Sequence, residues 1–199
     1  MLDQIKAVCE QTHAICEGSG SCTIEQVANL IMARTKIDDI VYKVYDVPRD
    51  NPIWGSFRRF HTLKVYDSAQ TLVEVRYAAH LTENERRFVV GKELCHALET
   101  NTGTHTASDQ AVSDLVAELA VFSTTERRGA TLPIAAEKLA EMAAIELFAP
   151  TSYRKKLIAN GEFERIGAPG MAAKLGLPEE YMGMAFSAGY MEVVESIVS

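Results

Sequence analysis

The fold is decided by the stretch Arg87-Phe88-Val89-Val90-Gly91-Lys92-Glu93-Leu94-Cys95-His96, near the middle of a chain of 199 residues. Just before it, Thr82 and Glu85 form a capping-box pattern, which predicts that a helix begins at Glu83. Apolar residues at helical spacing carry that helix to about Thr100. The quoted stretch is therefore predicted to be helical throughout.

In this helix Lys92 and His96 are four residues apart and project from one face. The frame is that of an H-E-x-x-H zinc helix, in which two histidines bind the ion and the adjacent glutamate activates a bound water as general base. Glu93 holds the general-base position, but Lys92 stands where the first histidine would be. A lysine ammonium has no lone pair and would have to lose a proton to bind zinc. The motif indicates either an altered metal site or an ordinary helix surface.

The segments before this helix change from helical to β-favouring patterns. Residues 1–35 are predicted to form two helices, the second beginning after a capping box at Thr23 and Gln26. Three β-favouring runs follow at 40–47, 57–66 and 71–77. Because the gap between the last two runs is short, we expect a small three-stranded sheet with antiparallel pairs.

Helical patterns dominate the rest of the chain. They cover 108–122, 133–148 and 152–158, and two short helices flank Leu175-Gly176-Leu177-Pro178. We therefore predict a mostly helical α+β fold with three parts: an N-terminal helical segment (1–35), a central domain (36–165) and a C-terminal helical unit (166–199) packed on the same domain.

Three blocks of the sequence resemble the ImmA/IrrE family of zinc metallopeptidases. In that family an arginine-phenylalanine pair precedes the H-E-x-x-H, as Arg87-Phe88 precedes Lys92 here. Residues 137–150 resemble the family's next helix, with an early glutamate, an alanine-rich middle and an apolar end before a proline. Residues 171–180 resemble its closing helix-turn-helix-like unit. The resemblance spans roughly 71–190 and implies a zincin-like domain.

The resemblance also implies the site residues. His96 matches the second zinc ligand, Glu93 the general base and Glu137 the third ligand. Glu118 is the alternative third ligand, because the interval from His96 to Glu137 is longer than the family's. Lys92 would stand at the former metal position and pair with Glu93 or Glu137, so that a salt bridge replaces the ion. A degenerate member is expected, with no cofactor at the Lys92 site.

Other side chains offer ways to rescue a zinc site. His80 and His105 flank the central helix, and Cys95 lies inside the motif. On a helix, however, Cys95 and His96 point about 100° apart, which favours a buried apolar role for the cysteine.

A second group of potential ligands lies near the N-terminus. Cys9, His13 and Cys16 share one helix face, and the glycine-serine turn that follows could bring Cys22 back toward them. Such a set could hold a structural zinc ion. The same stripe also carries Leu2 and Ile5, which makes it a candidate core face.

The composition of the chain limits the classes of partner that we expect it to bind. The formal net charge of −7 argues against general affinity for nucleic-acid backbones. No signal peptide or membrane span is evident, so membrane binding is not expected. Four cysteines without a dense framework suit a reducing compartment, and we expect a cytoplasmic protein.

Three functions stay open at this point. The favoured one is a pseudo-metallopeptidase that acts by binding a protein partner such as a transcriptional repressor, because Lys92 is unsuited to an ordinary zinc site. The second is an active zinc peptidase with a substituted ligand set that cleaves a repressor. The third is a regulator that binds DNA or a repressor through its C-terminal helices, although the second of these carries Glu179 and Glu180 and no basic residue.

Overall fold

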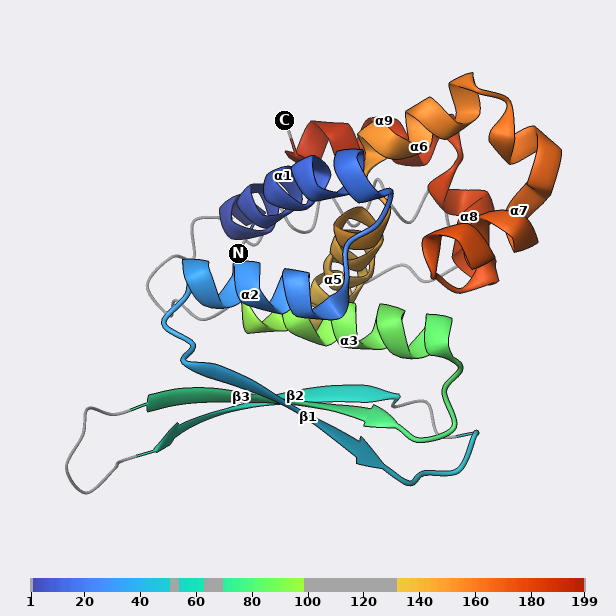
Figure 1. Ribbon diagram of the computed structural model, residues 1–199. Coiled ribbons are helices and arrows are strands. Elements are labelled where there is room, and N and C mark those ends of the chain that lie inside the picture. Colours follow the sequence, from blue (N-terminus) through green and yellow to red (C-terminus); the bar gives the residue numbers. More distant parts are fainter. Residues whose placement is uncertain (1, 51–53, 63–69, 99–131, 199) are drawn as a thin grey trace.

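A computed structural model describes residues 2–50, 54–62, 70–98 and 132–198. Within these ranges the chain has a mixed α+β fold, with a three-stranded sheet and helices stacked over it (Figure 1). In chain order the elements are α1 (Leu2–Ser19), α2 (Ile24–Arg34), β1 (Asp39–Tyr45), β2 (Gly55–Thr62), β3 (Gln70–Ala78), α3 (Glu83–Ala97), α5 (Leu132–Phe148), α6 (Thr151–Ala159), α7 (Glu162–Leu175), α8 (Glu179–Ala185) and α9 (Ala188–Val198). The helix predicted near 108–122 lies outside the described residues.

The sheet confirms one pairing prediction and corrects another. Its strand order is β1-β3-β2, and β2 runs antiparallel to β3 with Phe57 opposite Val75, as the short gap predicts. β1, however, runs parallel to β3, with Ile40 opposite Val73. The prediction of an antiparallel sheet is therefore wrong for β1. The chain passes through edge strand β2 before it reaches β3, and this long crossover permits a parallel pair.

The helices cover one face of the sheet (Figure 1). α3 packs against β2 and β3, while α2 and α5 pack against α3. The central strand β3 supplies Val73 and Val75 to this interface, and both are fully buried. Burying each such side chain contributes about 1.5 to 3 kcal/mol. Packing against the sheet thus stabilises the position of α3.

The first and last helices meet on the side away from the sheet. α1 contacts α2, α5, α6 and α9, so the N-terminal segment packs against the C-terminal half of the chain. Both predicted capping boxes are present, at Thr23 with Gln26 and at Thr82 with Glu85. None of the helices in the described ranges combines the length and apolarity needed to cross a bilayer.

Candidate functional site

Helix α3 carries the three residues of the predicted motif. Its capping box sets the first turn, and its inner face packs against the sheet and α5. Glu93 and His96 are buried, with 4% and 7% of their surfaces exposed. Lys92 is half-buried and borders a pocket. The helix therefore places a carboxylate and an imidazole inside the molecule, and an ammonium at the edge of the pocket.

The contact predicted between Lys92 and Glu93 is present. The Nζ atom of Lys92 lies 3.5 Å from Oε1 of Glu93, and the two side chains are 20% and 5% exposed. A buried carboxylate without a compensating charge is costly, and an adjacent ammonium offsets part of that cost. The positive charge beside the Glu93 carboxylate is thus that of the Lys92 ammonium.

His96 lies one helical turn beyond Lys92 and is covered by the sheet. The ring of Phe57, on β2, stacks on its imidazole, with 6.0 Å between ring centroids and 9° between ring planes. The stacked ring shields one side of the imidazole from solvent. This contact holds His96 by packing, as expected of a buried histidine in a hydrophobic core.

The third predicted ligand belongs to α5, which packs against α3. Glu137 lies one helical turn before Glu141 in this helix, but its side chain lies outside the described part of the structure. Glu141 borders the same pocket as Lys92 and accepts a hydrogen bond from Nζ of Lys138 at 2.7 Å. The sequence did not single out Glu141. Glu137 and Glu141 lie one turn apart on the same helix, and the sequence alone does not say which of them faces α3. The alternative ligand, Glu118, lies outside the described residues.

The pocket beside Lys92 has a volume of about 150 Å³ and joins four separate elements. Its lining includes three aromatic rings, one ammonium and three carboxylates: Trp54, Phe88, Tyr181, Lys92, Glu85, Glu141 and Glu180. Among the described side chains that line it, carboxylates thus outnumber ammonium groups three to one. This arrangement favours a positively charged group on a ligand.

The pocket depends on how the C-terminal unit packs against α3. The Nδ2 atom of Asn84 donates to the carbonyl oxygens of Ala172 and Leu177, at 3.3 and 3.2 Å. Phe88 stacks on Tyr181 with 4.2 Å between ring centroids. These contacts bring Glu180 and Tyr181 to the pocket that Lys92 borders.

The proposed rescue ligands do not gather around Lys92 and His96 in the described structure. His80 lies in the turn before α3, edge-on to Trp54 with 6.2 Å between ring centroids. Cys95 is fully buried, and burial together with the nearby charge of Glu93 raises its pKa. His105 lies outside the described residues. Cys95 thus behaves as the small buried side chain that its place on the helix predicts.

The four N-terminal residues divide into separate contacts. The Sγ atoms of Cys16 and Cys22 are 3.4 Å apart, whereas Nε2 of His13 lies 3.9 Å from Oε2 of Glu146. Cys9 is buried, and burial, with a smaller contribution from Glu146, raises its pKa. The predicted core face is confirmed, since Ile5, Cys9 and Cys16 are all buried.

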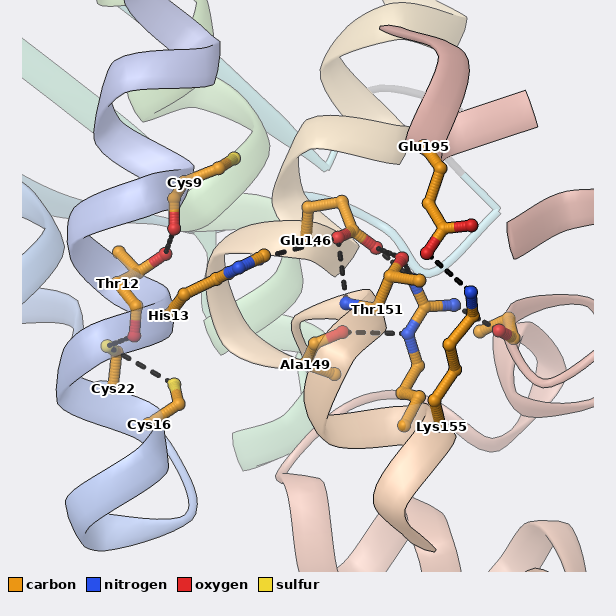
Figure 2. A network of polar contacts seen from close by, with 12 residues as sticks. Cys9, Thr12, His13, Cys16, Cys22, Glu146, Ala149, Thr151, Lys155 and Glu195 are labelled. Atoms are coloured by element: carbon orange, nitrogen blue, oxygen red, sulfur yellow. Dashed lines mark hydrogen bonds and ion pairs between the residues drawn. The ribbon is translucent and has the colours of Figure 1, made fainter. Parts of the chain in front are cut away.

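A buried ion pair lies beyond His13 and ties α5 to α6 (Figure 2). The guanidinium of Arg154 donates to Oε1 of Glu146, to Oγ1 of Thr151 and to the carbonyl oxygens of Ala149 and Ala185. Arg154 is fully buried and Glu146 is 2% exposed. The sequence contains one signal for this pair: Glu146 is a single charge inside the apolar run 143–149.

Among the described side chains around Lys92 and His96, the ligands of a zinc site are not brought together. In the described ranges no three His, Cys, Asp or Glu side chains are placed to hold a metal ion together, and Lys92 stands where a ligand would be needed. No protein-family model matches the chain, and no curated protein or solved structure matches it at a significant level.

Proposed function

We propose that this chain is a degenerate member of the ImmA/IrrE family that has lost zinc-dependent peptide hydrolysis and acts by binding a protein partner, such as a transcriptional repressor. The observation that carries the proposal is the ion pair between Lys92 and Glu93, with 3.5 Å between Nζ and Oε1. It joins the residue at the first metal position to the residue at the general-base position. A family enzyme needs a lone-pair donor at the first of these positions and a carboxylate facing a bound water at the second.

Two features of Lys92 support the loss of hydrolysis. An ammonium repels a dication and offers it no lone pair, so it competes with zinc for Glu93 without helping to bind the ion. Its charge also fills the electrostatic role of the ion, which lets the carboxylate remain buried. Lysine in place of the first histidine therefore preserves the fold but abolishes zinc-dependent hydrolysis.

The pocket supports a binding role. Aromatic and acidic side chains surround it, a combination that suits a lysine or arginine side chain from a partner segment. Glu180, on the pocket rim, is exposed and belongs to α8. The acidic character of α8 favours a basic protein segment over a nucleic-acid backbone as the partner.

The zinc content of the wild-type protein and of Lys92→His tests this proposal. After purification with excess zinc and dialysis, the wild type should retain none, whereas Lys92→His should retain about one equivalent because it restores the missing ligand. Lys92→Gln, which removes the charge without adding a ligand, is the control and should stay free of zinc. Zinc measured by mass spectrometry in the wild type, together with peptide cleavage that Glu93→Gln abolishes, would show an active peptidase instead.

A further inference from the structure

Two thiols meet where α1 ends. Cys16 lies in the last part of α1 and Cys22 in the short connection to α2, and their Sγ atoms are 3.4 Å apart. Figure 2 shows the two side chains pointing toward one another. A disulfide has an S–S distance of about 2.05 Å, so the two thiols are in non-bonded contact and a local shift of little more than 1 Å would bring their sulfur atoms to bonding distance.

A tight turn holds the pair together. Gly20 has a φ of 81°, in the left-handed region that favours glycine, and its amide donates to the carbonyl oxygen of Cys16 at 2.6 Å. The reversed chain then places Cys22 over α1, where its thiol lies 3.5 Å from the carbonyl oxygen of Thr12. The geometry thus follows from the backbone of the turn.

The surroundings of the two thiols differ. Arg87 of α3 donates to Oγ of Ser21 and to the carbonyl oxygen of Cys22, which places a guanidinium beside that residue. The pKa of Cys22 is lowered mainly by the hydrogen bond from Cys16; burial opposes this effect and the charge of Arg87 adds to it. The nearby guanidinium and the contact with Cys16 favour Cys22 as the nucleophile of the pair and Cys16 as the thiol that resolves the product.

We propose that Cys16 and Cys22 form an oxidant-sensitive dithiol that closes to a disulfide when the protein meets a peroxide. The Cys22 thiolate attacks one oxygen of hydrogen peroxide; the O–O bond breaks, and Cys22 becomes a sulfenic acid while hydroxide leaves. The sulfur of Cys16 then attacks the sulfur of Cys22; the S–O bond breaks, and the hydroxide released takes the proton of Cys16. The first hydroxide takes the proton that Cys22 lost on ionisation, so that in sum two thiols lose two electrons and one peroxide is reduced to two waters.

Access to the pair requires only local opening. Both thiols are buried, but Gly18 is exposed, and Gly20 and Ser21 are half-buried. Opening of this turn would expose the pair while the helices stay packed. Cys9 and Cys95 lie in the core, where burial raises their pKa, and they should react far more slowly.

The experiment treats the native protein with hydrogen peroxide, then denatures it, alkylates the remaining thiols and maps the peptides. Two of the four thiols should disappear into a Cys16–Cys22 link, and Cys22 should react at least about tenfold faster than Cys9 or Cys95. In urea this preference should vanish, because all four thiols are then equally exposed.

Two variants test whether the oxidation depends on Cys16 and Cys22 and not on the other thiols. Cys16→Ser should stop at a Cys22 sulfenic acid that dimedone traps, and Cys9→Ala should form the link at the wild-type rate. Circular dichroism checks that both variants fold. Oxidation of Cys9 or Cys95 before Cys22, or equal reactivity of all four thiols in the native protein, would overturn the proposal.

Discussion

At the scale of single residues, two buried carboxylates in this protein are neutralised by different means. Glu93 lies next to the ammonium of Lys92, which is partly exposed to a pocket. Glu146 lies next to the fully buried guanidinium of Arg154, which also binds two backbone carbonyl oxygens. The Arg154 guanidinium is fully buried and donates to backbone carbonyl oxygens as well as to Glu146, so the role of this pair is structural. In the other pair, the Lys92 side chain borders the pocket.

Removal of Arg154 should destabilise the protein strongly. Arg154→Met leaves the Glu146 carboxylate buried without its cation, and we expect the free energy of unfolding to fall by about 3 to 5 kcal/mol. Urea denaturation followed by circular dichroism measures this change. The double variant with Glu146→Leu should recover much of the loss, because no uncompensated charge is then buried.

The neighbouring Lys155 provides the matched control. Its Nζ atom pairs with Oε1 of Glu195 at 2.5 Å, but both side chains are about half exposed. Lys155→Met should therefore cost about 1 kcal/mol or less. Equal losses in Arg154→Met and Lys155→Met would show that burial does not decide the strength of these pairs.

At the scale of elements, the close contact between α3 and α5 positions the site. Gly91 lies on α3 against the ring of Phe148 on α5, and a Cβ atom added at Gly91 would overlap that ring. Phe148 also lies under the guanidinium of Arg87, which is 4.4 Å from the ring centroid. The absence of a side chain at Gly91 therefore lets the helix that carries Lys92 approach the helix that carries Glu141.

Gly91→Ala and Gly183→Ala should have opposite effects on stability. Alanine favours a helix over glycine by about 1 kcal/mol, but at Gly91 the overlap with Phe148 should cost about 1 to 3 kcal/mol and dominate. Gly183 lies in α8 with open space around it, so the helix preference should prevail there. Urea midpoints would compare the two variants. A rise in both midpoints would contradict the close packing at Gly91.

At the scale of the whole molecule, the pocket exists only because distant segments meet. Trp54 comes from the segment just before β2, Lys92 from α3, Glu141 from α5, and Glu180 from α8. Trp54 is also the single tryptophan of the chain. Its fluorescence is therefore a direct reporter of anything that enters the pocket.

A short arginine-containing peptide should change the fluorescence of Trp54 in a saturable way. The same peptide with glutamate in place of arginine should not, because carboxylates predominate in the pocket. Glu141→Gln should weaken binding by about two- to fivefold, and added salt should weaken it further.

Glu195→Gln makes the same charge change in α9, away from the pocket lining, and should leave peptide binding unchanged. If this variant weakens binding as much as Glu141→Gln does, the peptide responds to the net charge of the protein and the pocket is not its site.

The local features of this protein could be read from its sequence. Capping boxes act within four residues, so Thr23 and Thr82 predict where α2 and α3 begin. Apolar spacing predicts that Cys9 and Cys95 are buried. The contact between Lys92 and Glu93 does not follow from adjacency, because neighbouring residues of a helix point about 100° apart; it is seen in the structure.

Only the tertiary structure decided which distant segments lie together. In that structure β1 pairs with β3 in parallel, Glu141 borders the pocket beside Lys92, and Arg154 is buried against Glu146. These contacts depend on the rotation of each helix and on the order of the strands, which arise from packing between segments far apart in the chain. By itself, the sequence determined that Lys92 and Glu93 are neighbours on one helix, because a capping box and apolar spacing act locally; packing determined that Lys92 borders an acidic, aromatic pocket.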